Sequence, residues 1–124
     1  GLQLAAPGFK QIVVRPQVVG GLTFAEASIQ TPRGVAEVHW RRTNQSFELT
    51  TTIPVNSTAR VYLPKLGLKK IFVMENGMEC WKSGKFVQGP AGVTGATASE
   101  FWIELQVGSG NYEFRLRGAE KRVP

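Results

Sequence analysis

The chain has 124 residues, 42% of them hydrophobic, and a formal net charge of +6. These values predict one globular domain and exclude a disordered chain, and no apolar run approaches the ~20 residues that a membrane-spanning helix needs. Cys80 is the only cysteine in the sequence, which excludes an internal disulfide.

Strand-like runs separated by turn signals begin in the first third of the chain. We expect residues 1–10 to be a linker, in which Pro7-Gly8 would end any helix that enters it. Strands are predicted at Gln11–Gln17 and Leu22–Ile29, and Pro16 marks an edge or a strand end because it cannot donate to a ladder. The apolar residues of the second run alternate imperfectly, which predicts a bulge or a two-sided position.

The next two runs have the alternation and the short connection of a β-hairpin. Counting outward from the loop places Trp40 opposite Leu49 on an apolar face. The other face is polar and pairs Arg41 with Glu48, as expected for a sheet with one face in solvent. The two runs are Val35–Arg42 and Phe47–Ile53.

Six further strands are predicted from short apolar runs between turn signals. Residues 88–99 are rich in Gly, Ala and Thr and are expected to be a loop. Because no helical apolar period is present, the sequence predicts an all-β fold: a two-sheet antiparallel β-sandwich of about eight short strands at residues 11–118, with a tail at 119–124. The six runs are Ala59–Leu63, Lys69–Glu75, Met78–Lys82, Lys85–Val87, Phe101–Val107 and Tyr112–Arg117.

The last two of these runs are expected to form a hairpin around the loop Gly108–Asn111. Three apolar pairs would then share a buried face and fix the register. The opposite face would pair Glu104 with Arg115 and place Arg117 over the indole of Trp102. We therefore expect Trp102 to lie outside the sandwich core.

Four blocks of sequence follow one another in a recognisable order. The first contains Pro7-Gly8-Phe9, the run Ile12–Pro16, the motif Gly21–Ser28 and Pro32-Arg33-Gly34; the others are Phe47–Pro64, Glu75-Asn76-Gly77 and Val107–Phe114. Together they resemble the C-terminal β-sandwich domain of bacterial α-L-rhamnosidases, glycoside hydrolases whose catalytic domain is an (α/α)6 barrel. The resemblance covers about the whole chain. It departs at Phe24, where the pattern has tryptophan, and at Lys65–Lys70, which match no part of it.

The resemblance implies a non-catalytic accessory domain that packs on the catalytic barrel of the same chain and positions it. The parent would hydrolyse terminal α-L-rhamnose with carboxylates of the barrel, so no catalytic residue maps onto this chain. No cofactor, nucleic-acid partner or membrane partner is implied. The compartment is not fixed by the resemblance, and a soluble periplasmic or secreted parent is one expectation.

The residues themselves also argue against catalysis by this chain. Glycoside hydrolysis usually requires two carboxylates at a fixed separation, whereas the glutamates here fall mostly at outward-facing strand positions. His39 lacks the partners of a catalytic triad or a zinc site, so no metal site is expected. Cys80 is expected to be a small core residue. The positive charges are dispersed and accompany no nucleic-acid-binding motif, which favours a solvated surface.

Surface aromatic residues leave two functions open. Trp102 is a candidate platform that stacks on a sugar ring, which would make the chain a stand-alone carbohydrate-binding module. In the preferred interpretation Trp102 contacts the catalytic barrel, together with Arg117 and Phe9, because exposed apolar patches often mark contact surfaces.

Overall fold

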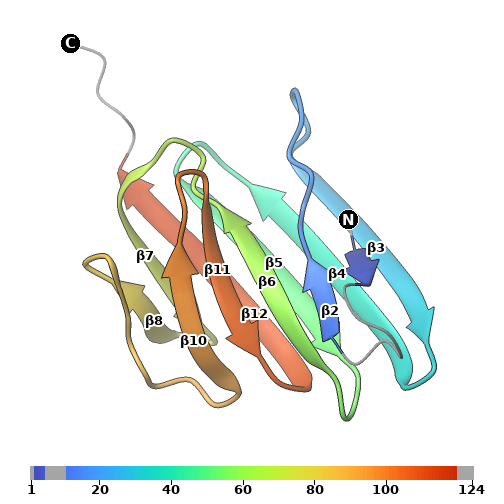
Figure 1. Cartoon of the computed structure of the whole chain (residues 1–124). Helices are drawn as coiled ribbons and strands as arrows, with labels where there is room; N and C mark the ends of the chain where they lie inside the picture. Colours follow the sequence, from blue (N-terminus) through green and yellow to red (C-terminus); the bar gives the residue numbers. More distant parts are fainter. Residues whose placement is uncertain (1, 5–10, 120–124) are drawn as a thin grey trace.

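The computed structural model describes residues 2–4 and 11–119, and every regular element in these residues is a β-strand (Figure 1). The strands form two sheets packed face to face, which confirms the predicted all-β sandwich. Neighbouring strands are antiparallel except for β2 and β6, which are parallel. The five-stranded sheet has the order β1 (Leu2–Leu4), β2 (Gln11–Val14), β6 (Thr58–Pro64), β11 (Trp102–Val107) and β10 (Val93–Ala98). The seven-stranded sheet has the order β3 (Phe24–Thr31), β4 (Gly34–Arg42), β5 (Ser46–Ile53), β12 (Gly110–Ala119), β7 (Lys69–Glu75), β8 (Met78–Lys82) and β9 (Lys85–Phe86).

The described residues contain twelve strands, more than the predicted eight or so. Part of the expected linker is a strand, because Leu2–Leu4 pair with β2, while residues 5–10, including Phe9, lie outside the described residues. The expected loop at residues 88–99 contains β10, which pairs with β11 at the edge of its sheet. An edge strand buries little of its surface, so small residues such as Gly95 and Ala96 are enough to form it. The alternation of large apolar residues that identifies a strand in a sequence is therefore weak here.

The predicted hairpin of β4 and β5 is confirmed, including its register, with Trp40 opposite Leu49 and Arg41 opposite Glu48. Of the two explanations for the imperfect alternation in this strand, a bulge is wrong, because β3 pairs with β4 without a break in register from Phe24 to Thr31. Exposure along β3 alternates regularly instead. The irregularity seen in the sequence arises because the outward side begins with an apolar residue, Phe24, which is 69% exposed.

The predicted hairpin of β11 and β12 is wrong, because the two strands belong to different sheets. β11 pairs with β6 and β10, whereas β12 pairs with β5 and β7. The connection through Gly108 and Ser109 therefore crosses from one sheet to the other. Each strand turns its apolar face to the interior from its own side, so the two faces meet across the core. The predicted cross-strand pairs of Glu104 with Arg115 and Trp102 with Arg117 do not form.

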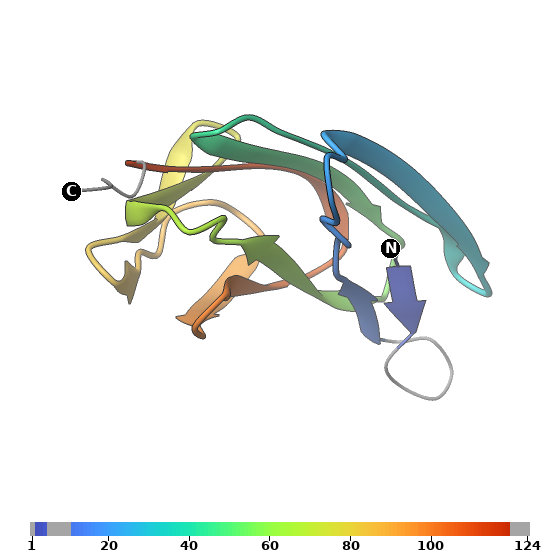
Figure 2. The same cartoon turned by 90° about the horizontal axis from the view of Figure 1, so that it is seen from above.

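The core lies between the two sheets and is drawn from both (Figure 2). Trp40 stacks on Phe47 at 5.3 Å, and Tyr112 stacks on Phe114 at 5.8 Å between ring centroids. Burying such side chains contributes ~1.5–3 kcal/mol each, which makes this layer the main source of stability. The largest fully buried members include Phe47, Phe114, Ile12, Leu49, Leu63, Ile103, Leu105 and Leu116.

Four loops gather at one end of the sandwich, which we call the loop end (Figure 1). Backbone hydrogen bonds hold them there: Arg42 N donates to Thr23 O at 2.8 Å, and Lys65 N donates to Phe101 O at 2.8 Å. Loops from both sheets therefore meet at the same end. They are residues 15–23, 43–45, 65–68 and 99–101.

Candidate functional site

A groove of about 1080 Å3 opens at the loop end, and we call it the loop-end groove. It is lined by residues 15–19, 42, 64–69 and 100–102. These residues come from the β2–β3, β6–β7 and β10–β11 connections and the strand ends beside them. Cations outnumber acids in this lining: the cations are Arg15, Arg42, Lys65 and Lys69, and the acid is Glu100.

Trp102 borders this groove at the start of β11, on the outward face of the five-stranded sheet. The guanidinium carbon of Arg15 lies 5.1 Å from the centre of the Trp102 ring and 5.4 Å from that of Tyr62. The two rings meet edge to face, with centroids 6.0 Å apart at 86°. Both geometries are attractive, because the cation faces the electron-rich ring surface and the ring edge carries positive charge. Arg15 thus takes the position over the indole that was predicted for Arg117.

Polar groups fix the orientation of Tyr62 next to Trp102. The Tyr62 hydroxyl donates to Glu104 Oε1 at 3.2 Å and accepts from Arg60 Nη1 at 3.4 Å. Arg60 Nη1 also lies 3.7 Å from Glu104 Oε1, and the Thr97 hydroxyl donates to Glu104 Oε2 at 3.4 Å. Side chains from three neighbouring strands therefore hold the Tyr62 side of the aromatic pair in place.

The most exposed apolar side chains of the loop end belong to Val19 and Phe101. Val19 is 66% exposed and Phe101 is 67% exposed. The strand predicted from Phe101 begins one residue later, at Trp102, so Phe101 belongs to the loop before β11. Aromatic and arginine side chains are enriched at protein interfaces, and exposed apolar patches mark contact sites. The loop-end groove has this composition.

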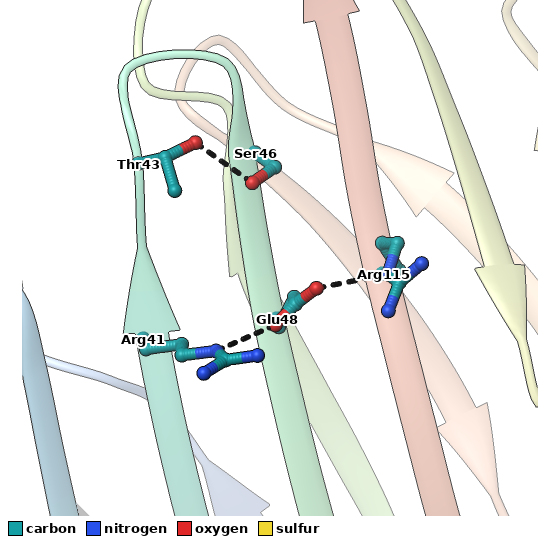
Figure 3. A network of polar contacts seen from close by, with 5 residues as sticks. All are labelled: Arg41, Thr43, Ser46, Glu48 and Arg115. Carbon is teal, nitrogen blue, oxygen red and sulfur yellow. Dashed lines mark hydrogen bonds and ion pairs between the residues drawn. The ribbon is translucent and has the colours of Figure 1, made fainter.

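The outward face of the seven-stranded sheet is different, because it carries ion pairs around Glu48 (Figure 3). Arg41 Nε lies 2.7 Å from Glu48 Oε2, and Arg115 Nε lies 3.0 Å from Glu48 Oε1. The hydrogen bond from Arg41 lowers the pKa of Glu48 below its ordinary value, and the charges of Arg41, Arg115 and Arg117 add to the effect against the opposing effect of burial. Arg117 thus belongs to this face and lies on a different sheet from Trp102.

The other residues weighed for chemistry have structural surroundings. His39 Nδ1 is 3.0 Å from Glu26 Oε2 on an exposed face. Cys80 is fully buried, which confirms its core placement, and burial with the nearby Glu75 charge raises the pKa of its thiol to about 12, so it stays protonated and unreactive. In residues 2–4 and 11–119 no three His, Cys, Asp or Glu side chains gather as a metal site would require. None of these residues forms a helix long and apolar enough to cross a membrane.

The sequence analysis singled out Trp102 but not Arg15, which lies beside it. Of the three predicted contact residues, Trp102 borders the groove, Arg117 lies on the other sheet, and Phe9 is outside the described residues. A signal for Arg15 was present: a lone cation between an apolar run and Pro16 stands where a strand must leave its sheet.

Comparison with known proteins gives one consistent relationship. Residues 1–77 match the family described as the bacterial alpha-L-rhamnosidase C-terminal domain. An alpha-L-rhamnosidase of Alteromonas sp. (strain LOR) is 39% identical over 64 residues, which are 52% of this chain and 7% of the relative. One of Formosa agariphila is 24% identical over 117 residues, or 94% of this chain and 12% of the relative.

Solved structures extend the match along nearly the whole chain. The alpha-L-rhamnosidase of Dictyoglumus thermophilum superposes with a TM-score of 0.78 at 29% identity, covering 94% of this chain and 12% of that one. The Streptomyces avermitilis alpha-L-rhamnosidase complexed with L-rhamnose gives a TM-score of 0.67 at 26% identity, covering 92% and 9%. The chain thus spans about a tenth of the length of these relatives.

Proposed function

Because the chain belongs to the family of bacterial α-L-rhamnosidase C-terminal domains, we propose that it packs on the catalytic domain of such an enzyme and positions it. The loop-end groove would be the contact surface, with Trp102 and Phe101 as its aromatic anchors. The partner would be the (α/α)6 barrel that the family resemblance implies. The parent would hydrolyse terminal α-L-rhamnose with residues outside this chain, in the periplasm or after secretion.

The single observation that carries this proposal is an exposed aromatic side chain beside a tryptophan ring that its neighbours hold in place. Phe101 is two-thirds exposed, and the Trp102 ring beside it is held by Arg15 and Tyr62. An apolar side chain at such a site gains its burial energy only when a partner covers it. A fixed aromatic surface also loses little side-chain entropy on binding, which suits a permanent contact between domains.

The division of the chain follows from the same proposal. Residues 1–10 would lead in from the catalytic domain, residues 11–118 would form the sandwich, and residues 119–124 would be the tail. Leu2–Leu4 already pair with β2, so the lead-in would be anchored on the five-stranded sheet. Such an anchor would restrict how the sandwich sits relative to the barrel.

Calorimetric titration of this chain into a parent protein from which the segment corresponding to this chain has been deleted tests the proposal. We expect saturable binding, weakened about tenfold or more by Phe101→Ala, because truncating a central aromatic anchor typically costs this much. Phe24→Ala is the matched control, since Phe24 is equally exposed but lies on the other sheet, and it should leave the affinity unchanged. Arg117→Ala asks whether the contact extends to the seven-stranded sheet. No binding at high concentration, or equal effects of the two phenylalanine changes, would refute the groove as the contact.

A second candidate function is carbohydrate binding by the domain itself. The observation that favours it is the Tyr62–Trp102 pair with hydrogen-bonding side chains beside it, which is the composition of a sugar site. Against it, Arg15 lies over the indole and competes for a ring face. Titration with a panel of rhamnosides and plant oligosaccharides separates the candidates: binding abolished by Trp102→Ala but retained in Phe101→Ala would favour the sugar site.

A further inference from the structure

Strand β3 forms one edge of the seven-stranded sheet, and within residues 2–4 and 11–119 no strand pairs with its backbone groups on that side. The bond from Arg42 N to Thr23 O fixes which residues face β4. Because bonding alternates along an antiparallel ladder, Ala25, Ala27 and Ile29 point their N–H and C=O groups toward β4. The free edge is then offered by the backbone groups of Phe24, Glu26, Ser28 and Gln30.

This edge lacks the devices that usually keep edge strands apart. β3 runs for eight residues without a bulge, and it contains no proline, lysine or arginine. Its one charged residue is Glu26, whose carboxylate is already turned to His39 on the neighbouring strand. A long, regular, lightly charged edge is a template for pairing with another strand.

The sequence of β3 is complementary to itself about Ala27. In an antiparallel pair centred there, Glu26 would lie opposite Ser28 of the second strand, which avoids the contact of two carboxylates. Phe24 would lie opposite Gln30. In both kinds of pair, the two residues that face each other are ones whose N–H and C=O groups point to the free edge. On the side that faces the core, Ala25 would lie opposite Ile29 of the second copy, and Ala27 would lie opposite Ala27 of the second copy. The Ala27 pair is not hydrogen-bonded, and such pairs have the shorter separation, which small side chains suit. A half-buried apolar layer would continue from one sheet into the next.

We propose that β3 is a dimerisation edge, at which two copies of this chain join their seven-stranded sheets into one through antiparallel β3–β3 pairing centred on Ala27. The two-fold axis makes the interface isologous, so each favourable pair occurs twice. Main-chain hydrogen bonds provide most of the attraction, and the Glu26–Ser28 pairs set the register. The loop-end groove is a separate surface, so this interface and the barrel contact are independent.

Sedimentation equilibrium of the intact chain over a range of concentrations tests the dimer. Ser28→Pro removes an N–H from the free edge while leaving the β3–β4 bonds in place, and we expect it to abolish association. Ser28→Ala keeps the N–H and should dimerise as the unaltered chain does. A chain that is monomeric at millimolar concentration, or one in which Ser28→Pro and Ser28→Ala associate equally, would overturn the proposal.

A charge pair tests the register without altering the backbone, which keeps the test valid if proline perturbs β3. Ser28→Lys would face Glu26 of the second copy and strengthen association, whereas Ser28→Glu would weaken it. Two such cross-strand pairs per dimer predict a change of roughly 2- to 30-fold in the dissociation constant in each direction. Equal effects of the two charges would contradict the register. Amide exchange gives a second readout, with protection that rises with concentration at Ser28 but is constant at Ala27.

Discussion

Trp40 and Trp102 both lie on β-strands but have different surroundings. Trp40 is 4% exposed between the sheets and stacks on Phe47, whereas Trp102 is half-buried on an outward face. We predict that Trp40→Ala lowers the free energy of unfolding by about 3–5 kcal/mol. Trp102→Ala should cost about 1–2 kcal/mol, because it removes one cation–π contact and one ring pair.

Urea unfolding of the two variants, followed by circular dichroism, measures both values. Similar losses would show that the outward aromatic pair contributes to stability as much as the core does. A Trp102→Ala chain that fails to fold would show that the ring belongs to the core.

Glu48 makes the stability of the domain depend on pH. Its pKa is lowered in the folded chain, chiefly by the hydrogen bond from Arg41, so between the folded and unfolded values the unfolded chain binds more protons. The stabilisation is therefore present above the ordinary pKa of 4.5 and is lost as the pH falls through the lower folded value. Glu48→Gln should remove about 1 kcal/mol of stability at neutral pH, a modest effect because the ion pairs are partly exposed.

Unfolding free energies measured from neutral pH down to pH 3 check this. The difference between the unaltered chain and Glu48→Gln should shrink as the solution is acidified. A constant difference would mean that the network of Figure 3 contributes through packing rather than charge.

Whether a strand residue faces the core or the solvent could be predicted from the sequence, because it depends on the alternation of apolar and polar residues within one strand. Trp40 follows from the pattern of its own strand, and its predicted inward placement is confirmed. Arg15 could not be placed in the same way, because its contact with Trp102 joins a residue after β2 to one in β11. Such contacts depend on which strands become neighbours, and strand order is not encoded in the period of a single run.

Near the end of β12, the backbone at Gly118 comes very close to the backbone of β7. The register shifts between Arg117 and Ala119, and a Cβ at Gly118 would lie 2.7 Å from Lys69 O, a backbone atom that cannot move aside easily. We predict that Gly118→Ala lowers stability by ~1–3 kcal/mol through overpacking. Gly108→Ala is the matched control, since nothing lies within 4 Å of its added Cβ.

Thermal unfolding of the two alanine variants decides the point. Gly118→Ala should melt several degrees below Gly108→Ala, which corresponds to ~1–3 kcal/mol in a domain of this size. Equal melting temperatures would mean that the end of β12 relaxes to accept the methyl group, and that the register shift at Gly118 does not fix the distance between β12 and β7.

The hairpins show why element pairing was only partly predictable. The β4–β5 connection is short and its polar face carries a matched charge pair, so only one register satisfies both faces. The β11–β12 connection gives an equally good pattern, yet the strands separate into two sheets. Apolar residues on both strands are buried whether the faces lie side by side or meet across the core, so alternation does not distinguish a hairpin from a crossing between sheets.

The whole molecule presents surfaces of different character, and we assign each a role. The ion-paired face of the seven-stranded sheet is stable in water, the loop-end groove offers aromatic and cationic contacts, and β3 is an edge strand of the described residues. Membership of the family places the chain among C-terminal domains of α-L-rhamnosidases. The role that we propose for this chain is attachment and orientation, and hydrolysis would be carried out by the rest of the parent.

Hydrogen exchange compared between the isolated chain and the full-length parent tests this attribution most directly. We predict slower amide exchange in the parent at Val19, Leu66 and Phe101, which lie at the loop end. Exchange at the opposite end, where Arg33 Nη1 donates to Asn56 O, should be the same in both proteins. Unchanged exchange at the loop end, or protection confined to the turns around Arg33 and Asn56, would contradict the claim that the loop-end groove holds the catalytic domain.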